Sequence, residues 1–345
     1  MKRLLLSLTA GALLASTVPA GAQDKLRLNL QNAFPTANPL VGTTSRDFVE
    51  RVRRVSNGAV DIRLHEPGAL VPALETFDAV SAGSLDMGWS VATNQSGRDP
   101  TFNFFGSVPF GPGIGEYLAW LEKGGGKELR DELYHKYNVQ AFTCGIASPE
   151  GAGWFKREIN SPDDLNGLKI RFAGLGAAIL AKFGAATQLI PAGEIYQALQ
   201  LGTIDASEFS TPIQDLALGF YQVAPYYYMP GWHQQSTAIE LLINKDRWDA
   251  MTDLQKAVIE ISCGATLADS IAFGESVQAG ALLEMKEKGV EIKTLPKEFL
   301  DALKEKWLEV VDEIRAENEL FDKTWQSYSA FREKYAIWGE TGYLK

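Results

Sequence analysis

One stretch of this sequence occurs twice, and the repeat constrains the fold more than any other feature. The first copy covers residues 71–89 and the second covers residues 190–208. Each copy reads as a proline-containing loop, a short helix, a glycine and a strand. The matched positions keep one offset throughout: Pro72 and Pro191, Glu75 and Glu194, Phe77 and Tyr196, Ala79 and Ala198, Gly83 and Gly202, and Asp86 and Asp205. Chance similarity is the alternative, but the distance between the copies favours two similar α/β lobes over a short-period solenoid.

The first candidate site residues lie at the ends of predicted strands in or near the two copies of the repeat. The last matched pair is Trp89 in the first copy and Glu208 in the second, and Arg171 lies near the end of the strand predicted at residues 168–172. In open α/β sheets, ligands bind beyond the carboxyl ends of the strands. We therefore expect these three side chains to face one cleft.

Strand and helix patterns alternate along most of the chain. From Thr252 onward the pattern is nearly all helical, apart from a short strand at residues 290–294. Alternation of this kind is typical of parallel α/β units, so we predict an α/β fold with two lobes that flank a cleft. The aromatic stripe within residues 298–338 is interpreted as core or dimer packing. The other predicted strands include residues 25–31, 60–65, 139–144, 154–159 and 238–244.

The first residues have the pattern of a secretory signal peptide. Lys2 and Arg3 precede the apolar run 4–14, and the small residues 20–22 form a cleavage site. The apolar run is too short for a convincing membrane span. No cysteine follows the predicted cleavage site directly, so a lipid anchor is not expected. Residues 1–22 are therefore predicted to be removed on export, which places the mature chain in the periplasm.

The charge of the chain limits its partners. The formal net charge is −10, and no basic run is present, which argues against nucleic acid and against an anionic membrane surface. An anionic small molecule is still compatible, because a single buried arginine can dominate a local site. The two cysteines, Cys144 and Cys263, could pair in an oxidising compartment or stay as two separate buried thiols.

Motifs of catalytic chemistry are absent from the sequence. There is no phosphate-binding G-x-x-x-x-G-K-[ST], no complete G-x-G-x-x-G, no H-E-x-x-H, no C-x-x-C and no G-x-S-x-G. His65, His135 and His233 are isolated and are interpreted as structural or exposed residues rather than catalytic ones. An enzyme is therefore disfavoured.

Several motifs together point to one family. They are Gly153-Trp154-Phe155-Lys156, Leu168-Lys169-Ile170-Arg171, Gly193-Glu194-Ile195-Tyr196-Gln197-Ala198-Leu199-Gln200-Leu201-Gly202-Thr203-Ile204-Asp205-Ala206, Asp215-Leu216-Ala217-Leu218-Gly219-Phe220-Tyr221 and Pro230-Gly231-Trp232-His233. Across essentially the whole mature chain, the sequence resembles the periplasmic solute-binding proteins of tripartite ATP-independent (TRAP) transporters. It is most similar to the branch that includes binders of 2-oxo acids and lactate, whose relatives are often labelled mannitol/chloroaromatic-type.

The resemblance implies a two-lobed periplasmic-binding-protein fold with the ligand cleft between the lobes and a helical C-terminal region. It also implies delivery of the ligand to TRAP permease membrane subunits. Family members with long C-terminal helices can dimerise, and a homodimer is compatible with the sequence. The predicted divisions are the signal peptide at 1–22, lobe I at 23–146 with a returning segment near 237–265, lobe II at 147–236 with a returning segment near 275–297, and C-terminal helices at 298–345.

The resemblance implies that Arg171 grips the carboxylate of the ligand, and the planar fork of arginine suits this role. A surface salt bridge is the alternative. Where relatives carry an aromatic cluster after the equivalent of Trp89, this chain has Asn94 and Gln95, which would make the pocket more polar. Phe34, which follows the first strand, completes the predicted ligand-binding set.

Some relatives hold a cation that bridges the protein and the ligand. The matching positions are Glu208, the main-chain carbonyl of Phe209, Gln234 and Glu150. Hard cations such as Ca²⁺ and Na⁺ prefer oxygen ligands of these kinds. If Glu150 and Glu208 converge, two carboxylates favour Ca²⁺ over Na⁺, whereas a solvated loop position for Glu150 is the alternative. No organic cofactor is expected.

The sequence therefore predicts an extracytoplasmic receptor for a small organic acid, with a 2-oxo or 2-hydroxy monocarboxylate as the leading class. A polyol-like, sugar-acid or aromatic-acid ligand is the alternative, which the polar Asn94 and Gln95 make more credible. A binding protein of an ABC-type importer is a further alternative. An exported enzyme is the least favoured.

Overall fold

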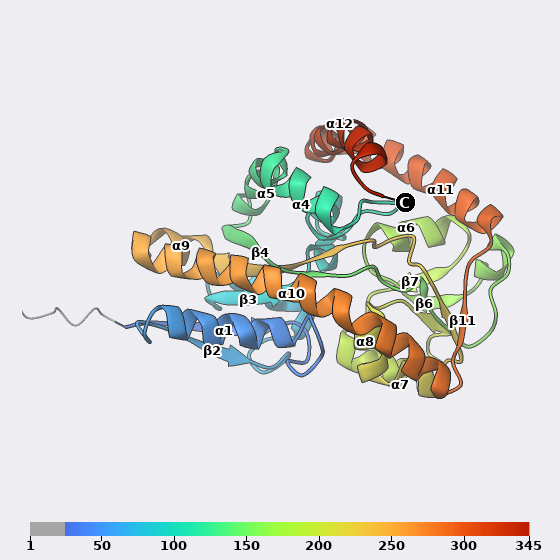
Figure 1. The fold of residues 1–345 in the computed structure, drawn as a ribbon, viewed down its shortest axis with the longest axis horizontal. Coiled ribbons are helices and arrows are strands. Elements are labelled where there is room, and N and C mark those ends of the chain that lie inside the picture. Colours follow the sequence, from blue (N-terminus) through green and yellow to red (C-terminus); the bar gives the residue numbers. More distant parts are fainter. Residues whose placement is uncertain (1–24, 345) are drawn as a thin grey trace, which may run out of the picture.

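A computed structural model describes residues 25–344, so the predicted signal peptide lies outside the described residues. The described chain contains two β-sheets (Figure 1). In the first sheet the strand order is β2-β1-β3-β10-β4. Its strands are β1 (Leu26–Asn32), β2 (Val60–His65), β3 (Met87–Ser90), β4 (Val139–Ala147) and β10 (Thr237–Asn244).

The second sheet has the order β11-β9-β5-β8-β6-β7. Its strands are β5 (Gly153–Phe155), β6 (Lys169–Arg171), β7 (Ala186–Gln188), β8 (Ala206–Ser207), β9 (Tyr226–Tyr228) and β11 (Glu291–Lys293). The chain passes from one sheet to the other three times: from β4 to β5, back from β9 to β10, and again through the helical segment between β10 and β11. We propose that the lobes meet at these three connections; the predicted lobe boundaries stay a prediction.

The two sheets share one topology. In the first, β1 pairs in parallel with β2 and β3, and in the second, β6 pairs in parallel with β7 and β8. Both sheets then continue with antiparallel pairs, β3 with β10 and β8 with β5. The prediction of parallel units is therefore correct for these three-stranded parts and for β9 with β11, which also pair in parallel, whereas β4 with β10 and β5 with β9 are antiparallel.

The sequence repeat corresponds to a repeated structure. Its helices are α2 (Thr76–Ser81), which follows the 3₁₀ turn Ala73–Glu75, and α7 (Ala192–Leu201). Each is followed by a glycine in the left-handed region, with φ of 75° at Gly83 and 74° at Gly202. The matched aspartates also act alike: Asp86 Oδ2 accepts a hydrogen bond from Asn29 N at 2.8 Å, and Asp205 Oδ2 accepts one from Lys169 N at 3.1 Å.

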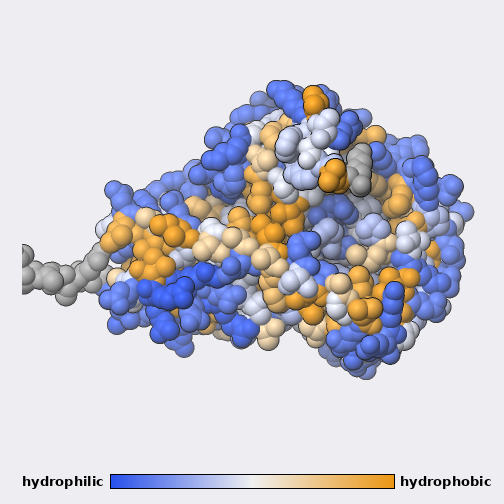
Figure 2. Space-filling model, in the orientation of Figure 1, coloured by the Kyte–Doolittle hydropathy of each residue, from blue (hydrophilic) through white to orange (hydrophobic). Residues whose placement is uncertain are grey.

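A long helix, α10 (Asp253–Glu287), runs along both sheets (Figure 1). By length and composition alone this helix could cross a membrane, but it packs against α1 (Thr43–Val55), β4 and α8 (Pro212–Leu218) as part of the fold. Figure 2 shows apolar residues along the outer side of the molecule where α10 lies. The exposed apolar side chains of α10 are Leu254, Ile261, Phe273 and Leu283. Such a side is compatible with the predicted homodimer, which stays a prediction.

The C-terminal segment forms two helices rather than one continuous amphipathic stretch. They are α11 (Lys297–Glu317) and α12 (Glu319–Thr341), and the break falls at Asn318, whose side chain accepts a hydrogen bond from Phe321 N at 2.9 Å and so caps α12. The first of them packs on α6 (Gly174–Lys182) and the second on α4 (Ile114–Lys123) and α5 (Gly126–His135). The remaining helices are α3 (Asn103–Gly106) and α9 (Lys245–Asp249).

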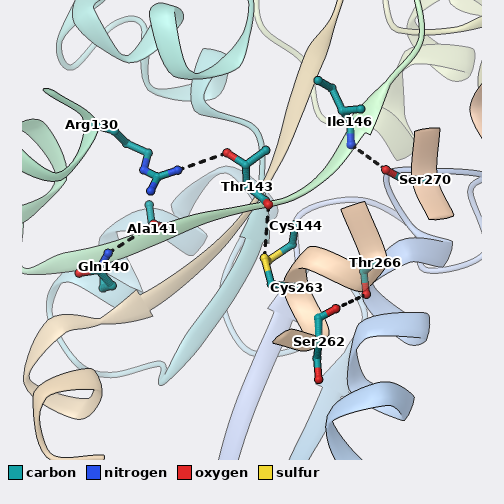
Figure 3. Close-up of a disulfide and its surroundings, with 10 residues drawn as sticks. All are labelled: Arg130, Gln140, Ala141, Thr143, Cys144, Ile146, Ser262, Cys263, Thr266 and Ser270. Carbon is teal, nitrogen blue, oxygen red and sulfur yellow. Dashed lines mark hydrogen bonds between the residues drawn. A yellow bond between two sulfur atoms is a disulfide. The ribbon is translucent and has the colours of Figure 1, made fainter. Parts of the chain in front are cut away.

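The two cysteines, for which the sequence left two arrangements open, form a disulfide (Figure 3). Cys144 lies on β4 and Cys263 on α10, so the bond attaches the long helix to the first sheet. Neither residue borders the cleft between the lobes. The disulfide therefore belongs to the scaffold.

Candidate ligand and cation site

A small, partly open cavity lies between the two lobes. Its wall combines charged and polar side chains with a few apolar ones and is therefore more polar than that of most small-molecule sites. Most of the predicted site residues border it. The lining residues are Phe34, Val41, Val91, Thr93, Asn94, Glu150, Arg171, Ala173, Glu208, Phe209, Ser210, Gln234 and Thr237.

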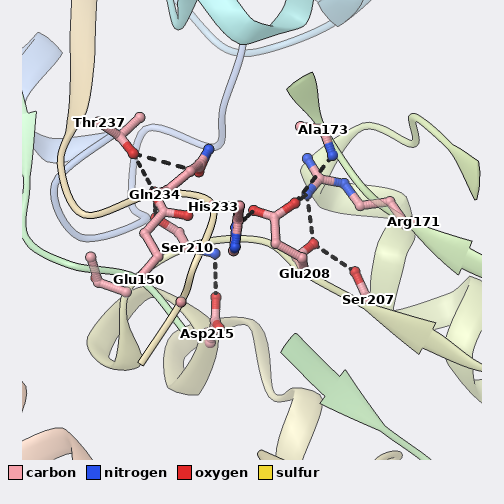
Figure 4. Close-up of polar contacts among 12 residues, drawn as sticks. Glu150, Arg171, Ala173, Ser207, Glu208, Ser210, Asp215, His233, Gln234 and Thr237 are labelled. Carbon is pink, nitrogen blue, oxygen red and sulfur yellow. Dashed lines mark hydrogen bonds and ion pairs between the residues drawn. The ribbon is translucent and has the colours of Figure 1, made fainter. Parts of the chain in front are cut away.

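Arg171 and Glu208 form a buried ion pair at the end of two neighbouring parallel strands (Figure 4). Arg171 Nη1 donates to Glu208 Oε2 at 2.7 Å and to the main-chain oxygen of Glu208 at 2.6 Å. Ala173 N also donates to Oε2, at 3.2 Å. The two side chains are almost fully buried, with 4% of Arg171 and 0% of Glu208 exposed. The alternative that Arg171 forms a salt bridge on the surface is therefore excluded.

The ion pair sets the charge state of Glu208. Burial by itself would raise the pKa of this carboxyl, but the nearby Arg171 and the His233 side chain hold that pKa below its usual value. The second carboxylate oxygen, Oε1, lies 3.5 Å from His233 Nε2 and has no hydrogen-bond partner among the described residues. Glu208 therefore keeps a negative charge with one oxygen still available.

Glu150 lies in the connection between β4 and β5 and is 1% exposed, which rejects a solvated loop position. Its Oε1 accepts hydrogen bonds from Thr237 Oγ1 at 2.7 Å and from Ser210 Oγ at 3.4 Å. Burial, followed by the charge of Glu208, raises the pKa of Glu150 well above its usual value. Within the described chain it pairs with no basic side chain, so its charge lacks the compensation that Glu208 receives.

The amide of Gln234 faces Glu150. With its nitrogen toward the carboxylate, the amide donates to Glu150 Oε2 at 2.7 Å and to Oε1 at 3.2 Å, and its oxygen accepts from Ser107 Oγ at 3.2 Å. With its oxygen toward the carboxylate, two groups of acceptors face each other. A cation between them would stabilise that second orientation, because it accepts lone pairs from both.

The residues around Glu208 fit a hard cation. Glu150, Glu208 and His233 each offer a ligand atom within 4.8 Å of the other two. Glu208 Oε1 is buried without a partner, and Gln234 can add an amide oxygen. Two carboxylates and an amide are the donor types that Ca²⁺ and Na⁺ take. The donor set is therefore suited to an oxygen-bound cation.

Two predicted site residues lie elsewhere. Trp89 is 0% exposed and packs against Phe48 of α1, with 5.5 Å between ring centroids, because its side chain points to the helix-covered face of β3. Gln95 ends the 3₁₀ turn Ala92–Gln95 and accepts a hydrogen bond from Arg98 Nε at 3.4 Å. Successive residues of such a turn point in different directions, so Asn94 faces the cavity and Gln95 does not.

Sequence reasoning missed several residues that support the site. Asp215 Oδ2 accepts from Trp154 Nε1 at 2.8 Å and its Oδ1 accepts from Ser210 N at 3.1 Å, which fixes the loop beside Glu150. Burial raises the pKa of Asp215 to about 8. His233 stands against Glu208, and its signals were its place in the family motif Pro230-Gly231-Trp232-His233 and its position beside Gln234. Asp215 had one signal, its place in a family motif.

Both lobes contribute apolar wall to the cavity. Phe34 from the first lobe contacts Phe209 from the second edge to face, with 6.3 Å between ring centroids. The guanidinium of Arg171 lies over the Phe209 ring at 5.4 Å from its centroid. This arrangement brings the lobes together around the charged groups.

Comparison with known proteins gives consistent matches. The family described as bacterial extracellular solute-binding protein, family 7 (DctP) matches residues 31–318. A monocarboxylate 2-oxoacid-binding periplasmic protein of Nostoc sp. is 31% identical over 333 residues, which are 95% of this chain and 90% of that protein.

Solved structures agree with that match. A TRAP transporter solute-binding protein of Bordetella bronchiseptica, with copurified calcium and picolinate, has a TM-score of 0.89 at 33% identity and covers 91% of this chain and 94% of its own. A TRAP periplasmic solute-binding protein of Pseudoalteromonas atlantica, with bound sodium and pyruvate, has a TM-score of 0.88 at 31% identity and covers 91% and 96%. The predicted two-lobed α/β fold is thereby confirmed.

Proposed function

This chain belongs to family 7 of the bacterial extracellular solute-binding proteins, the DctP family of TRAP receptors, and on that premise we propose that it captures a small 2-oxo or 2-hydroxy monocarboxylate between its lobes. The loaded receptor then delivers this acid to a TRAP permease in the membrane. We place the receptor in the periplasm, because the similar protein of Nostoc sp. is named a periplasmic protein. The family resemblance seen in the sequence is confirmed, and an ABC-importer protein or an enzyme is not supported.

Arg171 carries the proposal for the ligand class. Its Nη1 donates two hydrogen bonds to Glu208. Its Nη2 forms no hydrogen bond with another residue of the described range 25–344. Arg171 borders the cavity, so Nη2 can donate to a carboxylate bound there. Because Arg171 is almost fully buried, a charge-assisted contact with a carboxylate gains strength from the low local dielectric. A neutral ligand would leave this donor without a strong acceptor.

The polar groups around Arg171 suit a second oxygen on the ligand. Glu208, Gln234, Glu150 and the main-chain carbonyl of Phe209 are the proposed holders of a cation, as the sequence predicted. A bound cation supplies positive charge to which a carboxylate oxygen and the adjacent oxo or hydroxyl oxygen can bind together. Similar proteins of the two genera above hold calcium or sodium together with an organic acid.

Calorimetric titration tests the proposal. We expect pyruvate or lactate to bind the purified mature protein, with picolinate and a sugar acid tested as the alternative classes. Arg171→Lys keeps the charge but loses the planar fork, so binding should weaken by about 10-fold to 100-fold.

The matched control is Arg130→Lys. Arg130 is as buried as Arg171, and its Nη1 donates to Thr143 Oγ1 at 3.3 Å, but it does not line the cavity. Its affinity for pyruvate should stay at the wild-type level. Equal affinities of the wild type and Arg171→Lys for every acid that binds would contradict the proposed function.

A further inference from the structure

We propose that Thr93 selects the ligand by the end opposite its carboxylate, so that the receptor favours a small 2-oxo or 2-hydroxy acid with a further hydroxyl on C3 over the same acid with a methyl group there. The inference rests on the proposed function and deepens it. It gives a role to a side chain of the first lobe that belongs neither to the ion pair nor to the proposed cation ligands.

Two residues that line the cavity carry a buried polar atom without a hydrogen-bond partner in the described range 25–344. They are Glu208, through Oε1, and Thr93, through Oγ1. Glu208 Oε1 is an oxygen proposed to bind the cation, whereas the Thr93 hydroxyl has no such role. Thr93 is 2% exposed, so bulk water does not satisfy this hydroxyl. An unpaired buried hydroxyl is unfavourable and points to a partner that binds in the cavity.

The methyl group of Thr93 lies at a close contact between the lobes. A carbon added to Gly106 would lie 2.9 Å from Thr93 Cγ2, and a carbon added to Gly174 would lie 3.4 Å from it. Gly106 ends α3 of the first lobe and Gly174 begins α6 of the second. Because Oγ1 and Cγ2 leave the same carbon in different directions, the hydroxyl is not used in this contact. The methyl group therefore packs between the lobes, and the hydroxyl remains for a ligand.

The two lobes line different sides of the cavity. Arg171 and Glu208 belong to the second lobe, so an acid bound to Arg171 by its carboxylate turns its other end toward the first lobe. Two polar side chains of the first lobe border the cavity there, Thr93 and Asn94, and the Asn94 amide donates only a long hydrogen bond of 3.4 Å, to Ser90 Oγ. The other residues that the first lobe adds to the wall are apolar: Phe34, Val41 and Val91.

The chemistry of the Thr93 hydroxyl favours a hydroxylated ligand. A methyl group at C3, as in pyruvate or lactate, would leave Thr93 Oγ1 buried and unpaired. A hydroxyl at C3 can donate to Oγ1 or accept from it, because both groups have a donor and an acceptor. A site with a buried polar group discriminates strongly against an analogue that cannot pair with it. One added oxygen is also a modest increase in size for a small cavity.

Two pairs of acids that differ only at C3 test the proposal. They are 3-hydroxypyruvate with pyruvate, and glycerate with lactate of matched configuration. Calorimetry on the mature protein is run with both CaCl₂ and NaCl present, so that the cation does not limit binding. The hydroxylated acid of each pair should bind about 10-fold to 100-fold more tightly. The ratio of affinities within a pair is the measured quantity, because the contributions of the carboxylate and of the cation are common to both acids.

Three variants isolate the role of the Thr93 hydroxyl. Thr93→Val keeps the shape and replaces the hydroxyl with a methyl group, so the ratio within each pair should fall to about threefold or less. Thr93→Ser keeps the hydroxyl and should keep the preference. The matched control is Thr101→Val, since Thr101 is also buried with an unpaired Oγ1 but does not line the cavity; its ratio should stay at the wild-type value. Thermal unfolding checks that each variant is folded.

The outcomes separate the two proposals. If wild-type protein binds both acids of each pair equally well, or if Thr93→Val keeps the wild-type ratio, the role of Thr93 is overturned while the proposed function stands. An equal loss of affinity for all of these acids in Thr93→Val would show that the hydroxyl supports the fold or holds a water molecule, and would overturn it too. If none of the acids binds the wild-type protein, the proposed function itself is overturned.

Discussion

The two halves of this molecule perform different tasks with the same scaffold. Strand registers place Gln31 beside Gly88 in the first lobe and Arg171 beside Ser207 in the second. Since Gly88 and Ser207 are matched positions of the repeat, Gln31 and Arg171 are structural equivalents. By the same rule, Trp89 is the equivalent of Glu208.

The equivalent side chains differ in how far their hydrogen bonds are satisfied. Gln31 Nε2 donates to Val71 O at 2.9 Å and to Thr76 Oγ1 at 3.1 Å, and its oxygen accepts from the amides of Leu70 and Val71. Arg171 Nε makes only a 3.5 Å contact with Ile190 O, at the position equivalent to Val71.

The rest of the Arg171 guanidinium turns to Glu208 and to the cavity. One lobe therefore closes its strand ends with a neutral, saturated side chain above an apolar core. The other leaves charged groups with capacity for a ligand. The proposed ligand site depends on this difference and not on the shared framework.

The difference between the lobes is removed most directly by replacing Arg171 of the second lobe with glutamine, the residue that the first lobe has at the equivalent position. Arg171→Gln should weaken pyruvate binding by about 100-fold or more, because the carboxylate loses its charged partner. The variant should also lose about 3–5 kcal/mol of stability, since Glu208 stays buried without compensation. Calorimetry and urea unfolding measure the two effects.

The double variant Arg171→Gln/Glu208→Gln removes both charges of the pair. It should recover most of the lost stability and none of the affinity. Recovery of binding in this double variant would show that Arg171 is not the carboxylate-binding group.

Trp89 tests the other side of the comparison. Trp89→Ala should reduce the free energy of unfolding by about 3–5 kcal/mol, because it leaves a cavity in the core of the first lobe. The affinity of the folded protein for pyruvate should change by less than about threefold, since Trp89 does not line the ligand cavity. A large loss of affinity with unchanged stability would show that Trp89 contributes to ligand binding.

A buried carboxyl outside the cavity allows a test by pH. Glu240 accepts a hydrogen bond from Tyr134 at 2.5 Å, and burial raises its pKa from 4.5 to about 8. The folded state therefore holds this proton more tightly than the unfolded state. Its contribution to stability is complete below about pH 4.5 and is lost as the pH rises through 8.

Glu240→Gln removes the titrating group. Relative to wild type, the variant should gain up to a few kcal/mol between pH 5 and pH 8, measured by urea unfolding at each pH. A parallel shift of both stability curves, with no change in slope, would argue against a protonated Glu240.

The smallest expected effect on stability concerns the glycine that ends the repeated helix in both lobes. Gly83→Ala and Gly202→Ala each place a side chain at a left-handed φ, with no atom closer than 3.5 Å and 3.9 Å respectively to the added carbon. The cost is therefore backbone strain alone, about 1 kcal/mol in each case. Thermal unfolding of the two variants should give similar shifts, and clearly unequal shifts would show that the two copies carry different strain.

The sequence predicted the framework better than the direction of side chains. Residues 71–89 and 190–208 kept one offset, so their common fold could be recognised. The equivalence of Gln31 and Arg171 could not, because α1 has 13 residues and α6 has 9, while β2 has 6 and β7 has 3, which changes the offset.

Among the candidate site residues, the outcome depended on local geometry. Arg171, Glu208, Glu150 and Gln234 all border the cavity, since each lies at a strand end or in a connection between the lobes. Trp89 packs on Phe48 and does not border the cavity, because strand position does not tell which face of the sheet a side chain takes. His233 and Asp215 approach the site only through tertiary packing, which no local pattern reports.

The broken C-terminal helix has a mechanical consequence. Its first part packs on α6 of the second lobe and its second part on α4 and α5 of the first, while Asn318 between them donates to Asp99 Oδ1 at 3.0 Å. The lobes are thus joined by two strand connections, by the long helix α10, which packs on β4 and on α8, and by the C-terminal pair α11 and α12 with Asn318 between them. Links at several separate places resist sliding of one lobe past the other, so we expect the cleft to open by a rotation of the lobes.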